Sequence, residues 1–325
     1  MPNRRDPDAA GRGLEEDAPR GVPNGLGDLP WELPHTFLGL DESADSFHRS
    51  DAVLLPVPYE STTSWGSGTR RGPGAILAAS RYIELHDHEF GCEPGARLGI
   101  HTLPALELTR AGATPAMAEL QAAYARVASA CGDRFLLMLG GEHSISSASV
   151  LAQADRHEDR LTVLQLDAHA DLRAEFEGTP HSHASAMARV LDRADVVAVG
   201  VRGVSQEEVD VSESSAASTL VWADEMWADD RWMDRAMEAL GPKVYLTFDV
   251  DYFDPSYVPS TGTPEPGGGD WYRTLRFLKR VFEEREVVAA DIVELAPTPG
   301  LNAPDFLVAK LAYKLISYRF QARLG

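Results

Sequence analysis

The chain has 325 residues, of which 44% are hydrophobic and 25% charged, a composition typical of globular proteins. Fifty acidic against thirty basic side chains give a formal net charge of −20, which argues against nucleic-acid and membrane partners, since both need a basic patch. Two cysteines, no apolar run of about 20 residues and no N-terminal apolar stretch predict a reduced, cytoplasmic protein without disulfides, membrane span or secretory signal.

Residues 1–33 differ in composition from the rest of the chain. They are rich in Pro, Gly and charged residues and poor in aromatic residues. Such a segment cannot bury enough apolar surface to offset the entropy lost on ordering. We therefore predict a mobile N-terminal arm over residues 1–33 and a single domain over residues 34–325.

Short apolar runs alternate with helical patterns along the predicted domain. In chain order we expect a strand at Ala52–Pro56, helices at Gly72–Ile83 and Pro115–Ala130, a strand at Phe135–Leu139, a helix at Ser144–Ala154, a strand at Leu161–Leu166, a helix at Ala184–Leu191, a strand at Val196–Val201, a helix at Asp229–Leu240, a strand at Val244–Phe248, a helix at Trp271–Glu283, a strand at Val287–Val293 and a helix at Pro304–Tyr318. Short, nearly continuous apolar strands between helices favour a parallel sheet covered on both faces.

Three of the expected strands run directly into acidic residues and histidines. The groups that follow them are His143, then Asp167, His169 and Asp171, then Asp249 and Asp251. Residues at i, i+2 and i+4 diverge on a helix but share one face of an extended segment. Because the carboxyl ends of parallel strands meet at one edge of a sheet, we expect these groups to converge there.

Converging carboxylates repel one another and raise one another's pKa, and divalent cations remove this repulsion. Six nitrogen and oxygen donors are too many for one catalytic ion with open positions, but fit two ions that share bridging carboxylates. The donor set suits manganese better than a thiolate zinc site. Alone, the D-x-D pair could be a turn or cap and His143 could be structural, whereas the DAHAD block by itself already favours a functional site. The conjunction of the three favours a dinuclear metal site.

The blocks GGEHS, DAHADLR and FDVDYFDP resemble, in order and approximate spacing, the metal-binding blocks of the ureohydrolases, the family of arginase and agmatinase. The segments VPYESTTSWGSGTRRGP, GTPEPGG and DIVE resemble further parts of that family, and the likeness spans roughly residues 50–320. It implies a three-layer α/β/α sandwich with a mainly parallel eight-stranded sheet. Glu142, where many members have Asp, and His183-Ala184-Ser185, where many have His-Gly, depart from the family pattern.

The resemblance also assigns roles. It implies one ion on His143 and Asp171, a second on His169 and Asp251, and bridges from Asp167 and Asp249. It implies that Glu294 binds the substrate guanidinium and that His183 transfers protons, with Asp171 as an alternative donor to the leaving nitrogen. Without the family, Glu294 reads equally well as a solvated strand-end acid and His183 as a turn or capping residue, and His181 lies close enough to exchange places with His183.

The loop Leu172–Ser182 guides the choice of substrate. It lacks the Asn- and Ser-bearing pattern of arginase and carries Glu175 and Glu177, which suit a substrate with a distal amine. We expect hydrolysis of agmatine to putrescine and urea, with aminopropylagmatine, guanidinobutyrate or a formimino compound as alternatives and arginine less favoured. The resemblance further implies a homo-oligomer, a trimer or hexamer.

Overall fold

The computed structural model of the chain describes residues 32–41 and 44–325. The arm predicted over residues 1–33 therefore lies outside the described residues, except for its last two positions. Within the described part, every helix is too short or too polar to cross a membrane. Cys92 and Cys131 are both buried and unbridged, in keeping with the absence of a disulfide framework.

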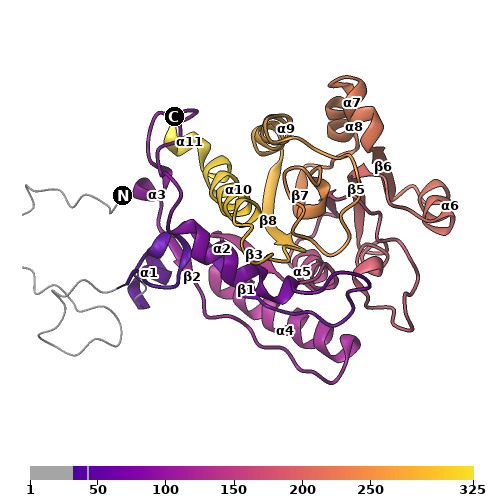
Figure 1. Cartoon of the computed structure of the whole chain (residues 1–325), viewed down its shortest axis with the longest axis horizontal. Helices are drawn as coiled ribbons and strands as arrows, with labels where there is room; N and C mark the ends of the chain where they lie inside the picture. Colours follow the sequence, from indigo (N-terminus) through magenta and orange to yellow (C-terminus); the bar gives the residue numbers. More distant parts are fainter. Residues whose placement is uncertain (1–31, 42–43) are drawn as a thin grey trace, which may run out of the picture.

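A single sheet of eight strands forms the centre of the described part of the domain, in the order β2-β1-β3-β8-β7-β4-β5-β6. All its strand pairs are parallel. Figure 1 shows β8 and β7 near the middle of the molecule. The strands are β1 (Ala52–Val57), β2 (Ile100–Thr102), β3 (Phe135–Gly140), β4 (Leu161–Leu166), β5 (Ala194–Val201), β6 (Ser218–Trp222), β7 (Lys243–Asp249) and β8 (Glu286–Val293). Every strand predicted from the sequence is present, and the edge strands β2 and β6 are additional.

Helices cover both faces of this sheet. They are α1 (Ala44–Arg49), α2 (Gly72–Ser80), α3 (Pro94–Arg97), α4 (Ala113–Cys131), α5 (Ser144–Ala154), α6 (Gln206–Ser214), α7 (Ala223–Ala228), α8 (Arg231–Ala239), α9 (Trp271–Glu284), α10 (Ala303–Arg319) and α11 (Gln321–Leu324). Within the described ranges, four short 3₁₀ turns add to them: η2 (Phe37–Gly39), η3 (Thr69–Arg71), η4 (His183–Ser185) and η5 (Val250–Tyr252).

Alternate residues of each strand enter different hydrophobic layers, which confirms the three-layer architecture. On β3, Phe135, Leu137 and Leu139 pack into the layer under α2, α8, α9 and α10. Leu136 and Met138 pack into the layer under α4 and α5. The two-residue period of a strand thus places every strand between two helical layers.

The helix predicted over Ala184–Leu191 is wrong. This segment contains the short turn η4 and then a series of turns. Its backbone does not form a regular helical ladder, because the amides of Met187 and Ala188 both donate to the carbonyl of Asp171. The segment is folded around the loop after β4, and this tertiary contact overrides its helical propensity.

A buried ion pair joins α10 to the segment between α2 and α3. Lys314 is 4% exposed, and its Nζ lies 2.8 Å from Asp87 Oδ2 and 2.5 Å from Glu89 Oε1. Removing the cation leaves the carboxylate of Asp87, which is 3% exposed, without its ammonium partner.

We expect Lys314→Met to lower the free energy of unfolding by about 3–5 kcal/mol, the usual effect of breaking a buried ion pair. The matched control is Lys279→Met, because the Lys279 ammonium also faces Glu89, at 3.4 Å, but is 37% exposed. This control should change stability by about 1 kcal/mol or less. Urea denaturation of both variants, followed by circular dichroism, measures the difference, and equal effects would contradict the assignment.

Candidate active site

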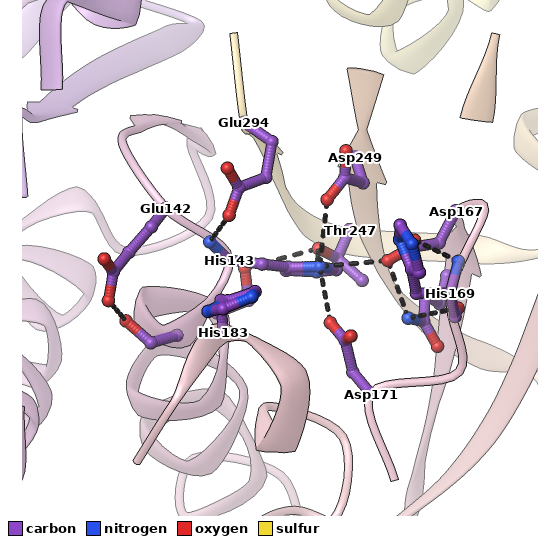
Figure 2. Close-up of polar contacts among 12 residues, drawn as sticks. Glu142, His143, Asp167, His169, Asp171, His183, Thr247, Asp249 and Glu294 are labelled. Atoms are coloured by element: carbon purple, nitrogen blue, oxygen red, sulfur yellow. Dashed lines mark hydrogen bonds and ion pairs between the residues drawn. The ribbon is translucent and has the colours of Figure 1, made fainter. Parts of the chain in front are cut away.

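Four neighbouring strands at the centre of the sheet carry the residues expected to form the site. Strands β3, β8, β7 and β4 are consecutive in the sheet, so their carboxyl ends lie side by side. His143 follows β3, Glu294 follows β8, Asp249 ends β7 and Asp167 follows β4. Figure 2 shows these side chains pointing toward one another. The convergence predicted from the sequence is therefore present in the structure.

His143 is the centre of the first cluster. The Nδ1 atom of its ring lies 3.0 Å from Asp167 Oδ2, 2.9 Å from Asp171 Oδ2 and 3.3 Å from Asp249 Oδ2 (Figure 2). This nitrogen is buried, yet none of these contacts has hydrogen-bonding geometry. Three carboxylate oxygens thus lie within 3.3 Å of a buried imidazole nitrogen that forms no hydrogen bond with them.

A second cluster shares one residue with the first. His169 Nδ1 lies 3.0 Å from Asp251 Oδ2 and 3.5 Å from Asp167 Oδ1. The donor atoms of Asp167, His169 and Asp251 lie within 4.8 Å of one another, as do those of the His143, Asp167 and Asp249 group. Asp167 therefore offers one oxygen to each cluster, the arrangement of a bridging carboxylate.

The clusters are electrostatically unfavourable without a cation. Burial and the charge of Asp167 raise the pKa of Asp171 to about 7. Burial together with the charges of Asp251 and Asp167 raises the pKa of Asp249 well above its ordinary value. Burial alone would lower the pKa of His143, but the surrounding carboxylates raise it well above its usual value. Divalent cations among these donors relieve the repulsion, so the residues present fit two metal ions.

A hydrogen-bond relay behind His143 fixes its orientation. The Thr247 hydroxyl donates to Asp291 Oδ1 at 2.6 Å and lies 2.9 Å from His143 Nε2. Because that hydroxyl proton is already used, Nε2–H donates to Thr247 and Nδ1 keeps its lone pair for a metal. Sequence reasoning overlooked Thr247, although a polar residue within the apolar run VYLTF is a signal for it.

The loop after β4 depends on a buried glutamate in α6. Asp171 has a φ of +53°, an uncommon backbone conformation for a non-glycine residue. The next amide, that of Leu172, donates to Glu208 Oε1 at 3.1 Å. Ser205 and Glu208 form a capping box at the start of α6. Glu208 was not predicted to act at the site, although the S-x-x-E spacing signals the cap.

Glu142 connects the loop after β1 to the site. Its Oε2 accepts hydrogen bonds from the amides of Ser61 and Thr62, both at 2.6 Å, and its Oε1 accepts the Thr62 hydroxyl at 2.7 Å. The neighbouring Gly141 has no room for a side chain, since a Cβ would lie 1.8 Å from Tyr59 O. The loop after β1 is therefore held directly against the end of β3.

Glu294 lies beside the metal clusters with one oxygen engaged. Its Oε1 accepts the His143 amide at 2.6 Å, and the residue is 6% exposed. Among the described residues, no group donates a hydrogen bond to Oε2. Burial and the charge of Glu142 raise the pKa of Glu294 well above its ordinary value. A cationic group bound at Oε2 would stabilise the ionised form.

His183 lies next to the loop after β1. Figure 2 shows its ring on the same side of the site as Glu142. Its amide donates to Thr62 Oγ1 at 3.0 Å, and its ring nitrogens lie 3.4 Å from that same oxygen and 3.3 Å from Ser64 Oγ. Burial lowers the pKa of His183. His181 has no contact of this kind with the loop, and burial also lowers its pKa.

Glu175 and Glu177 are exposed and have no described contact with either cluster. They flank Phe176, whose ring meets the His183 ring edge-on at a centroid distance of 5.9 Å. Their predicted role in binding a distal amine remains a prediction.

We expect Thr247→Val to weaken metal binding about 10- to 100-fold, since the His143 ring loses the partner that orients it. Thr247→Ser should retain most of the affinity because it keeps the hydroxyl. Thr219→Val on the edge strand β6 is the control and should bind metal as the unsubstituted chain does. Calorimetric titration of metal-free protein with manganese measures all three, and unchanged affinity in Thr247→Val would contradict the relay.

Comparisons with known proteins agree with this geometry. The N(1)-aminopropylagmatine ureohydrolase of Synechocystis is 38% identical over 88% of this chain and 94% of its own length. The agmatinase of Pyrococcus horikoshii is 29% identical over 87% of this chain and 98% of its own. The crystal structure of agmatine ureohydrolase from Thermoplasma volcanium superposes with a TM-score of 0.75 at 25% identity, covering 86% of this chain and 94% of that one. The arginase family model matches residues 50–317, and the chain belongs to the arginase family.

Proposed function

We propose that the chain hydrolyses a guanidine bearing a distal amine, with agmatine as substrate and putrescine and urea as products. The observation that carries this proposal is the position of Glu294, a buried carboxylate with one free oxygen beside two clusters that fit metal ions. A guanidinium paired in a charge-assisted hydrogen bond to that oxygen would lie next to the clusters.

N(1)-aminopropylagmatine is the second candidate substrate. The relative at 38% identity is named for it, whereas the relative named agmatinase is 29% identical. Both substrates place a cationic tail away from the guanidinium, which suits a chain with a net charge of −20. Guanidinobutyrate has an anionic tail and fits this charge poorly.

Different residues of this chain would bind the metal ions, orient the guanidinium and transfer a proton. Two divalent ions, which we propose to be manganese, would be held by His143, His169 and the four aspartates and would lower the pKa of a bound water toward neutrality. Glu294 orients the guanidinium. His183 is neutral near pH 7 because its pKa lies below the ordinary value, so it is suited to accept a proton and pass it to the leaving nitrogen. Asp171 is the alternative donor.

We also propose that the chain forms a homo-oligomer, a trimer or hexamer, as its resemblance to this family implies. Light scattering combined with size-exclusion chromatography tests this directly, and a monomer at micromolar concentration would contradict it.

Urea release from a panel of substrates tests the proposed function. We expect turnover of agmatine or N(1)-aminopropylagmatine to exceed that of arginine, guanidinobutyrate and formiminoglutamate. Urea release from arginine alone would overturn the proposal that the substrate tail carries an amine and no carboxylate. Release of formamide from formiminoglutamate would show that the chain hydrolyses a formimino group instead of a guanidine.

Asp249→Asn should remove most bound metal and activity. Its carboxylate lies 3.3 Å from His143 Nδ1 and belongs to the first cluster, and the amide that replaces it carries no charge. Elemental analysis should find two metal ions in the unsubstituted chain and fewer in the variant. One ion or none in a fully active chain would contradict the dinuclear site.

His183→Asn should retain both ions and lower kcat by about a hundred- to ten-thousandfold, the usual loss for a general acid or base. The wild-type rate should fall on the acidic side, because protonated His183 cannot accept a proton. Since burial lowers its pKa, that fall should be centred below the ordinary pH of about 6.5, and it should be absent from the variant.

His181→Asn is the matched control for this experiment and should leave kcat and the metal content nearly unchanged. Metal loss in His183→Asn would make His183 a ligand. A large effect at His181 with none at His183 would assign proton transfer to His181 instead.

A further inference from the structure

Trp65 is 85% exposed, the largest exposure among the large hydrophobic side chains of the described residues. A single exposed hydrophobic residue is ordinary on a protein surface, so its meaning depends on where it lies. Trp65 belongs to the loop between β1 and α2, which the Glu142 carboxylate holds against the site.

The residues on either side of Trp65 each contact the rim of the site. Ser64 Oγ lies 3.3 Å from His183 Nε2. The Gly66 amide donates to Gly262 O at 3.0 Å, and a Cβ on Gly262 would lie 3.7 Å from Glu294 Oε2. The residue before Trp65 therefore contacts His183, the proposed proton-transfer residue. The residue after it contacts Gly262, which lies beside Glu294, the proposed guanidinium-binding carboxylate.

The backbone that carries Trp65 is fixed at both ends of the loop. Glu142 accepts the amides of Ser61 and Thr62 on one side. On the other, Glu60 accepts the Gly68 amide at 3.0 Å and the Arg70 amide at 2.9 Å. With the backbone fixed, an indole that binds a ligand loses the freedom of only its two side-chain torsions, which limits the entropy cost.

We propose that Trp65 is a specificity-determining residue whose indole binds the distal ammonium of the substrate at the rim of the site. This inference rests on the proposed function and identifies the residue that recognises the distal amine of the substrate. Glu294 Oε2 faces Gly262, whose carbonyl accepts the Gly66 amide, so a guanidinium on that oxygen would lie close to the loop that carries Trp65. Tryptophan is the best aromatic partner for a cation, and its negative ring face disfavours a carboxylate. The rim would thus select amine-tailed guanidines over guanidinobutyrate.

The test compares Trp65→Leu and Trp65→Phe with the unsubstituted chain on agmatine and on butylguanidine, which has no tail charge. Tyr82→Leu is the control, since Tyr82 is 72% exposed but follows the far end of α2. We expect Trp65→Leu to raise KM for agmatine by about two- to fivefold relative to butylguanidine, the effect of an exposed cation–π contact, with kcat unchanged. The KM of Trp65→Phe for agmatine should lie between those of the unsubstituted chain and Trp65→Leu. Tyr82→Leu should leave KM unchanged for both substrates.

Putrescine binding, followed by calorimetry on the manganese-loaded chain, gives a second measurement that does not need turnover. Its affinity should fall about two- to fivefold in Trp65→Leu and remain unchanged in Tyr82→Leu.

Three results would overturn the inference: equal KM changes for agmatine and butylguanidine, putrescine binding unaffected by Trp65→Leu, or no putrescine binding at all. A change of oligomeric state in Trp65→Leu by light scattering would assign the indole to a subunit contact instead. Absence of urea from every guanidine would overturn the proposed function, whereas urea release with unaltered tail selectivity would overturn this inference alone.

Discussion

The repulsion between four buried aspartates is the constraint on which the rest of the site depends. Asp167, Asp171, Asp249 and Asp251 are each 4% exposed or less. Carboxylates so close together and so far from water do not all ionise unless cations lie among them. All four lie on segments that end or follow β4 and β7, two neighbouring central strands of the sheet.

Two residues at the site have backbone conformations that side chains rarely adopt. Asp171 has φ +53° and Glu294 has φ +65°. Each such residue costs about 1–3 kcal/mol and persists only where its surroundings hold it. Glu208 holds the amide that follows Asp171, and the His143 amide holds the Glu294 carboxylate. Glu294 directly follows β8 and Asp171 lies in the loop after β4, and both side chains face the clusters (Figure 2).

The convergence of the Asp and His side chains could be predicted because a parallel sheet aligns the carboxyl ends of its strands. The expected extended backbone is only partly present, since Asp171 has φ +53° and Asp251 lies in the 3₁₀ turn η5. The edge strands β2 and β6 escaped prediction because β2 has three residues and β6 is only partly buried, so neither gives a strong apolar run. Thr247 and Glu208 escaped because their partners lie 44 and 36 residues away in sequence.

The proposed site draws on two parts of this architecture. The metal clusters and Glu294 lie at the ends of sheet strands, whereas His183 and Trp65 lie on loops that meet over those ends. Glu142 joins the two parts, since its carboxylate binds Thr62, and Thr62 in turn accepts the amide of His183. A change in the loop after β1 therefore reaches His183 and the rim through Thr62. Loops of this kind can vary in sequence while the strand ends that they cover keep their residues.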